Sequence, residues 1–280
     1  MTATLPTCYR HPGRETGVRC QRCERPICPD CMVPAPVGVQ CVECVRRLRP
    51  PVSAGRQVRL ATTWFSVTGI LVAANVGVWV LGLVLAGPAA PRALMSGSPL
   101  APVGALFGPS VAAGEWWRLF TAGFLHSGLL HLGLNMVGLY ILGPPVEQAL
   151  GRLRFSALYL AGLAASSLGA LLISPTVPTV GASGAIFALM GALLLGQRAA
   201  GIDLRSSGIL GLVVANLIFT FVVPGIAIGG HLGGLAGGLL AGAVLFRPQL
   251  QPALSTLACL GLAAACTAAG LWAAAHPLVG

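Results

Sequence analysis

The 280-residue sequence contains no lysine, so all 17 of its basic residues are arginines. Acidic residues are scarce as well: only seven occur, which leaves a formal net charge of +10. Charged residues make up 9% of the chain and hydrophobic residues 55%, with a mean hydropathy of +0.83. Since a soluble globular domain carries about 25% charged residues, this composition predicts a multi-pass membrane protein.

The arginines are unevenly distributed. They concentrate in the first 60 residues and in short loops between apolar runs, a pattern that indicates membrane orientation and argues against a nucleic-acid partner. With the N-terminus inside, the inner loops carry ten arginines and the outer loops only Arg92 and Arg118. We therefore expect a plasma (cell inner) membrane protein, with a cytoplasmic N-terminal region and an extracytoplasmic C-terminus.

Seven apolar runs are predicted to form membrane helices in the lipid bilayer. They cover about residues 63–86, 130–148, 153–173, 182–198, 207–224, 228–246 and 253–274. Residues 87–129 contain many prolines and glycines and the pair Trp116-Trp117. We expect a partly embedded loop there, with aromatic side chains at the membrane interface.

Seven of the nine cysteines precede residue 45, and with His11 they form four pairs of one spacing. The pairs are Cys8 with His11, Cys20 with Cys23, Cys28 with Cys31, and Cys41 with Cys44. Eight ligands make two four-coordinate sites, the number that tetrahedral zinc requires. Disulfides are the alternative, but seven cysteines is an odd number and a cytosolic segment lies in a reducing compartment.

Few apolar residues surround these ligands. A core of Val18, Ile27, Met32 and Val39 is too small to fold alone, so two structural zinc ions must supply most of the folding energy. The order of the pairs resembles B-box and RING-like double zinc fingers. That resemblance implies interleaved ligation, first pair with third and second with fourth. The domain would occupy residues 1–46 and bind a protein partner, followed by a basic linker over residues 47–60 on the inner membrane surface.

Three of the predicted spans carry polar side chains near their outer ends. Ser183 begins the fourth span, His231 lies in a glycine run of the sixth, and His131 and Asn135 share one face of the second. A lone Gly-x-Ser-Gly could simply help helices to pack. Because these spans run in the same sense, however, all four side chains are expected at a similar depth. Polar groups there are costly, which favours a functional site.

The residue types suggest acyl transfer. Ser183 would be the nucleophile and His231 its base, with His131, Asn135 and the backbone N–H of Ser183 as oxyanion donors. Phe187, one turn below Ser183, could pack against the His231 ring. We expect a Ser–His dyad, because no carboxylate is tied to His231 by the sequence. The acidic residues of the membrane part are only Glu115, Glu147 and Asp203.

At these positions the sequence resembles the rhomboid family of intramembrane serine proteases. The resemblance covers about residues 60–246. It rests on Trp117-Arg118, Phe124-Leu125-His126, His131-x3-Asn135-Met136, Gly181-x-Ser183-Gly184 and His231 with its glycines. It implies an all-α polytopic fold with a six-helix core over residues 61–250 and a cavity open to the outside. Residues 251–280 would add one further transmembrane helix.

The resemblance also implies an activity and several residue roles. The enzyme would be a serine-type endopeptidase that cleaves transmembrane protein substrates near the outer ends of their membrane segments, without a catalytic cofactor. Trp117 and Arg118 would form a structural loop motif, and Glu147 would be structural. One alternative is a catalytically inactive rhomboid fold that binds or chaperones membrane helices, although this chain keeps both serine and histidine. A transporter is a further alternative, but the predicted spans of this chain lack the intramembrane charges that would couple ions to transport.

Overall fold

The computed structural model describes residues 5–34, 38–48, 66–205 and 207–277. The chain divides into two compact units, Met1–Ala61 and Thr62–Gly280. The predicted linker over residues 47–60 lies outside the described residues except at its first two positions, which end a helix. Its extent and its place on the membrane surface stay predictions.

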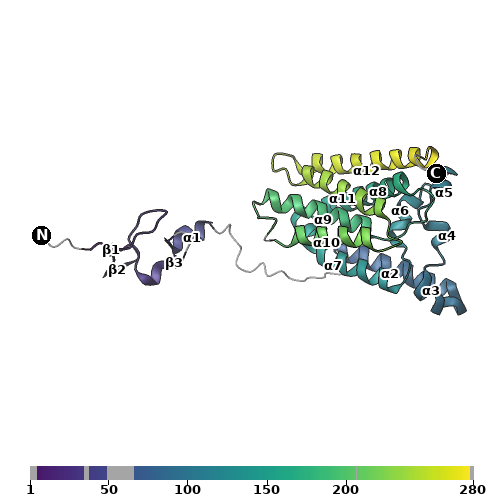
Figure 1. The fold of residues 1–280 in the computed structure, drawn as a ribbon. Coiled ribbons are helices and arrows are strands. Elements are labelled where there is room, and N and C mark those ends of the chain that lie inside the picture. The colour runs from purple at the N-terminus through teal and green to yellow at the C-terminus, as the bar shows by residue number, and fades with distance from the viewer. Residues whose placement is uncertain (1–4, 35–37, 49–65, 206, 278–280) are drawn as a thin grey trace. The chain divides into compact units, whose positions relative to one another are not determined.

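The N-terminal unit combines two small antiparallel strand pairs with short helices (Figure 1). Strand β1 (Thr7–Cys8) pairs with β2 (His11–Glu15), and β3 (Met32–Pro34) pairs with β4 (Val39–Cys41). The 3-10 helix η1 (Pro29–Cys31) precedes β3, and α1 (Val42–Leu48) follows β4. Each strand pair carries cysteines or His11 at its ends, so the pairs bring distant ligands together.

The interior of this unit consists mainly of cysteines around Ile27, whose side chain is fully buried. Met32 and Val39 pack against this cluster as predicted. The prediction for Val18 was wrong, because its side chain is 40% exposed. The N–H of Ile27 donates to the carbonyl oxygen of Val18 at 2.9 Å, so Val18 contributes its backbone to the unit and not its side chain.

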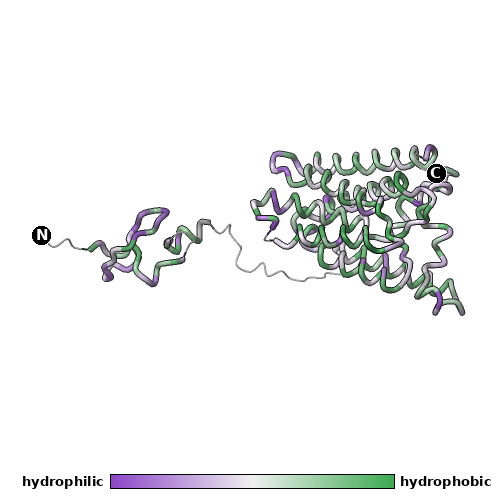
Figure 2. The backbone as a smooth tube through the Cα atoms, viewed as in Figure 1, coloured by the Kyte–Doolittle hydropathy of each residue, from purple (hydrophilic) through white to green (hydrophobic). Residues whose placement is uncertain are grey.

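Seven long helices make up most of the second unit and lie side by side (Figure 1). They are α2 (Val67–Ala86), α7 (Leu129–Leu150), α8 (Arg152–Ile173), α9 (Ser183–Ala199), α10 (Ile209–Val222), α11 (Ile228–Leu245) and α12 (Pro252–Ala275). Five helical stretches are long and apolar enough to cross a membrane, whereas α9 and α10 are shorter, with 17 and 14 residues. Hydrophilic residues gather in the loops at the helix ends (Figure 2).

The segment between α2 and α7 is irregular, as the sequence predicts. It contains η2 (Gly87–Ala89), α3 (Ala90–Ser96), α4 (Ala101–Gly104), α5 (Gly108–Ala112), α6 (Arg118–Thr121) and η3 (Ala122–Phe124). The structure differs from the prediction in one respect. The first apolar stretch continues beyond residue 86, so the candidate span runs from Val67 to Met95.

Arg118 holds this irregular segment together. Its side chain is 5% exposed, and the guanidinium donates to the carbonyl oxygens of Ala105 at 2.8 Å and Pro102 at 2.6 Å and pairs with Glu115. The indole N–H of Trp117 donates to the carbonyl oxygen of Val103 at 3.2 Å. These bonds satisfy carbonyl groups that no regular helix would satisfy, so both side chains stabilise the loop.

The glycine run of α11 lets this helix approach two neighbours closely. A Cβ on Gly233 would lie 2.4 Å from the carbonyl oxygen of Ala165 in α8. On the other face, a Cβ on Gly234 would lie 2.0 Å from the carbonyl oxygen of Gly184, at the start of α9. Only glycine permits such backbone contact, so α11 lies between α8 and α9 and brings His231 next to Ser183.

Glu147 joins the C-terminal end of α7 to the start of α2. Its carboxylate accepts hydrogen bonds from the backbone N–H groups of Val67 at 2.8 Å and Thr68 at 2.9 Å, and from the Thr68 hydroxyl at 2.7 Å. The first N–H groups of a helix have no intrahelical acceptor, and a carboxylate is favourable beside them. Glu147 therefore caps another helix and does not take part in the site around Ser183.

Candidate active site and candidate metal centres

Ser183 and His231 lie within hydrogen-bonding distance. The Oγ atom of Ser183 is 2.8 Å from Nε2 of His231. Ser183 is the first residue of α9 and His231 lies in the first turn of α11, so two parallel helices present their N-terminal ends to the same place. His231 is 9% exposed, and the Ser183 residue is partly exposed.

Two further side chains surround the His231 ring. Phe187 stacks on it with ring centroids 4.4 Å apart and an interplanar angle of 22°, as the one-turn spacing from Ser183 predicts. On the far side of the ring from Ser183, Nδ1 lies 2.7 Å from the hydroxyl oxygen of Thr220 in α10. Among the described residues, the hydrogen bonds of this ring include no carboxylate.

His131 lies beside Gly181, two residues before Ser183. Its Nδ1 faces Ser127, with the Ser127 backbone N–H at 3.3 Å and the Ser127 hydroxyl at 2.9 Å. A backbone N–H can only donate, so Nδ1 is the acceptor and Nε2 carries the hydrogen. Nε2 points to the space next to Gly181, where an added Cβ would lie 2.8 Å from Nε2 and 3.6 Å from Oγ of Ser183. Gly181 also has φ +127°, which other residues rarely adopt.

Asn135 follows His131 by one helical turn. Its side-chain nitrogen donates to the carbonyl oxygen of His131 at 2.8 Å, and its Oδ1 is buried without a hydrogen-bond partner in the described part of the chain. An amide nitrogen carries two hydrogens, so one remains for another acceptor. The ring of His126 packs edge-on against His131, with centroids 5.1 Å apart.

The four polar residues predicted to share one depth thus come from the N-terminal turns of three helices. Sequence reasoning missed Ser127 and Thr220. Ser127 lies four residues before His131, a spacing that could have suggested a contact. Thr220 precedes His231 by 11 positions, and the turn between α10 and α11 lies between them. A threonine in the last turn of a helix is only a weak signal for a contact with the next helix, because threonine hydroxyls commonly bond to their own helix.

The eight predicted metal ligands lie in two groups of four. The groups are Cys8, His11, Cys28 and Cys31, and Cys20, Cys23, Cys41 and Cys44, with the ligand atoms of each group within 4.8 Å of one another. This is the interleaved order that the resemblance to double zinc fingers implied. The described cysteines are free thiols and form no disulfide.

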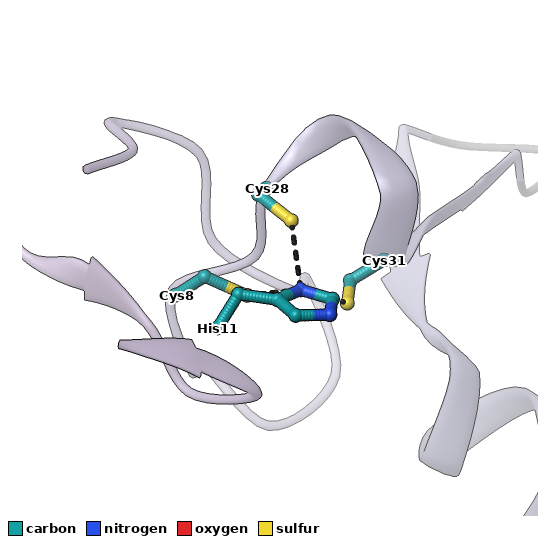
Figure 3. Close-up of side chains that lie close together, drawn as sticks. All are labelled: Cys8, His11, Cys28 and Cys31. Carbon is teal, nitrogen blue, oxygen red and sulfur yellow. Dashed lines mark hydrogen bonds between the residues drawn. The ribbon is translucent and has the colours of Figure 1, made fainter. Parts of the chain in front are cut away.

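The separations suit a tetrahedral ion. Nδ1 of His11 lies 3.2 Å from Sγ of Cys28 and 3.4 Å from Sγ of Cys31 (Figure 3). The sulfurs of Cys23 and Cys41 are 3.8 Å apart. Sulfur atoms at about 2.3 Å from one zinc ion lie about 3.8 Å from each other in a tetrahedron.

The electrostatics of the thiols also favour a cation. Burial raises the pKa of Cys20, but the backbone N–H groups of Cys41, Arg22 and Cys23 outweigh it and lower the pKa to about 6. In the other group, burial and the neighbouring sulfurs raise the pKa of Cys31 to about 11. Thiolates are the form that binds metal, and a divalent ion would remove the conflict between the clustered sulfurs.

The fold and the site together define a class: a multi-pass helical membrane protein with a serine and a histidine hydrogen-bonded among its helices. Residues 113–248 match the family model described as the Rhomboid domain. This part of the chain is therefore a rhomboid domain. The match covers α7 to α11 and lies outside the N-terminal unit and α12.

Curated relatives agree. The chain is 38% identical over 142 residues to "Rhomboid protease GluP" of Bacillus subtilis (strain 168), which is 50% of this chain and 28% of that protein. It is 41% identical over 101 residues to "RHOMBOID-like protein 6, mitochondrial" of Arabidopsis thaliana, 35% of this chain and 33% of that protein. It is 35% identical over 78 residues to "Rhomboid-related protein 3" of Homo sapiens, 28% and 19%. The chain therefore spans a third or less of the length of these relatives.

Proposed function

We propose that this protein is an intramembrane serine endopeptidase that hydrolyses peptide bonds in or next to the transmembrane segments of other membrane proteins. The observation that carries the proposal is the 2.8 Å contact between Oγ of Ser183 and Nε2 of His231. A serine becomes a nucleophile when a base accepts its proton. The alternative, an inactive rhomboid-fold binder of membrane helices, gives no reason for this pair to be in contact.

The reaction uses Ser183 and His231 in both halves. Oγ of Ser183 adds to the carbonyl carbon of the scissile peptide while its proton passes to Nε2 of His231. The C–N bond then breaks as His231 gives that proton to the leaving amine, and the acyl group stays on Ser183. Water, deprotonated by His231, attacks this ester, so the carboxylic acid leaves and Ser183 regains its proton. No catalytic cofactor is needed.

Three donors surround the developing oxyanion in this proposal. The Nε2–H of His131 and the spare amide hydrogen of Asn135 come from the first two turns of α7, and the backbone N–H of Ser183 comes from the start of α9. N–H groups at the start of a helix lack intrahelical acceptors, and the helix dipole adds positive potential there. Removing one oxyanion donor typically costs about 10²–10³ in rate, so Asn135→Ala would leave residual activity.

The direct test uses detergent-solubilised protein, a fluorophosphonate probe and a transmembrane model substrate. Wild-type protein should be labelled and should cleave, whereas Ser183→Ala and His231→Ala should do neither. The double variant should be no worse than either single one, because the pair acts as a unit. Ser255→Ala is the matched control, since Ser255 is buried in α12 and its hydroxyl donates to the carbonyl oxygen of Pro252 in the same helix. Cleavage by Ser183→Ala at the wild-type rate, or no cleavage and no labelling by folded wild type, would overturn the proposal.

We further propose that each four-residue group of the N-terminal unit holds one structural zinc ion and that this unit faces the cytoplasm, where it contacts a protein partner. The arginine asymmetry supports an extracytoplasmic C-terminus. A reporter active only outside the cytoplasm, fused after Gly280, should therefore be active. A well-expressed but inactive fusion would mean that α12 does not cross the membrane.

A further inference from the structure

The site contains a residue with no role in the Ser183–His231 pair as proposed above. Thr220 lies in the last turn of α10, and its residue is 1% exposed. α10 ends at Val222, and a short turn with Gly225 at φ +81° leads into α11, which begins at Ile228. The last turn of α10 is therefore held against the first turn of α11, where His231 lies.

The Thr220 hydroxyl makes two short contacts, and its single hydrogen decides their direction. Its oxygen lies 2.7 Å from the carbonyl oxygen of Asn216 and 2.7 Å from Nδ1 of His231. A carbonyl oxygen can only accept, so the Thr220 hydrogen is donated to Asn216. The second contact is then a hydrogen bond only if the Nδ1–H of His231 donates to the Thr220 oxygen.

This direction settles which nitrogen of His231 can accept. With its hydrogen on Nδ1, the neutral ring has a lone pair on Nε2, the atom 2.8 Å from Oγ of Ser183. The hydrogen bonds thus run in one direction, from Ser183 to His231 to Thr220 to the Asn216 carbonyl. The opposite tautomer would leave Nε2 unable to take the Ser183 proton.

We propose that Thr220 is a positioning residue, which fixes the tautomer and the orientation of His231 in the place that a carboxylate holds in a Ser-His-Asp triad. This inference rests on the proposed protease function. When His231 takes the serine proton, its Nδ1–H becomes a charged donor, and the bond to Thr220 strengthens in the transition state. Being neutral, a hydroxyl stabilises the imidazolium less than a carboxylate does, so its loss should slow the reaction without abolishing it.

The test compares two substitutions at this position with a matched control. Thr220→Val keeps the shape and removes the hydroxyl, and it should lower kcat and the fluorophosphonate labelling rate roughly 10- to 100-fold, the range for a hydrogen bond to a charged group. KM should not change, because Thr220 contacts the ring and not the substrate. Thr220→Ser restores the hydroxyl and should return both rates to within about threefold of wild type.

Thr256→Val is the control, because the Thr256 hydroxyl is also buried and bonds to its own helix, at the carbonyl oxygen of Pro252, far along the chain from any site histidine. It should cleave as wild type. Equal kcat and labelling in wild type and Thr220→Val would overturn the positioning role while leaving the protease proposal intact. Equal losses in Thr220→Val and Thr220→Ser, with a lowered melting temperature, would also overturn it and show a packing role. Cleavage by Ser183→Ala would instead overturn the protease proposal itself.

Discussion

The two units of this chain are stabilised in different ways. The N-terminal unit buries mostly cysteines and one isoleucine, so its interior has little apolar surface to stabilise it. The membrane unit brings backbones together through glycine and alanine, with α11 against α8 and α9. We therefore expect the first unit to depend on bound metal ions and the second on steric fit between helices. Conditions or substitutions that act on one unit should leave the other unchanged.

Metal removal should have the largest effect. With chelator, the N-terminal unit should lose its protease resistance completely, since structural zinc contributes about 10–16 kcal/mol of apparent binding energy. Protons compete with zinc for the thiolates, so the metal should be held more weakly as the pH falls. The helical content and the fluorophosphonate labelling of the membrane unit should not change.

The substitutions that test this are Cys31→Ser and its control Cys259→Ser. Both cysteines are buried, but Cys259 lies in α12 and belongs to neither group of ligands. Elemental analysis should find less zinc only in Cys31→Ser. Two zinc ions retained in that variant, or none in wild type purified without chelator, would contradict the metal sites.

A larger side chain at the contact between α11 and α9 should have the next largest effect, in this case on the membrane unit. Gly234→Leu places a side chain where even a Cβ would lie 2.0 Å from the carbonyl oxygen of Gly184. We expect destabilisation of at least about 3 kcal/mol and loss of cleavage, because the helices must separate. Zinc content should stay at the wild-type value. Gly261→Leu is the control, since a Cβ there meets nothing within 4 Å, and equal melting temperatures for the two variants would refute steric packing as the cause.

A substitution at Gly181 should have the third largest effect, a loss of activity at the site within the membrane unit. In Gly181→Ala the added carbon meets the His131 ring at 2.8 Å and requires φ +127°. We expect activity to fall about 100-fold, as for the loss of one oxyanion donor. The control Gly133→Ala lies in α7 with no neighbour within 4 Å of the added carbon and should be fully active. Normal turnover by Gly181→Ala would show that the space beside His131 is not used.

Glu147 should give the smallest effect. Glu147→Gln removes the charge that caps the start of α2 and should lower the stability of the membrane unit by about 1–3 kcal/mol. Activity at low temperature should persist, because Glu147 contacts Val67 and Thr68 and no residue of the site. Gln148→Ala, at an exposed neighbouring position, is the control. A full loss of activity without loss of stability would assign Glu147 a role in the reaction.

Many of the ligand and site residues could be predicted because they occur in local sequence patterns. The spacing of Cys20 and Cys23 predicts a ligand pair at once, and the helical repeat predicts that His131 and Asn135 share a face. The closeness of Ser183 and His231 was predicted because both lie near the predicted outer ends of spans that run in the same sense. The core of the N-terminal unit was harder: Val18 is apolar, yet its backbone and not its side chain contributes.

By itself, the sequence determined the membrane class and the ligand pairs, because each depends on composition or on residue types at short, fixed spacings. It also predicted that Ser183 and His231 lie close together, because both lie near the same ends of spans that run in the same sense. Only the tertiary structure decided that Thr220 lies behind His231, that Gly181 leaves space beside His131, and that Glu147 caps α2. The physical reason is that these contacts join different helices. Their geometry depends on how each helix is rotated and how closely it packs, and that follows from backbone contacts such as Gly234 with Gly184, which no local pattern encodes.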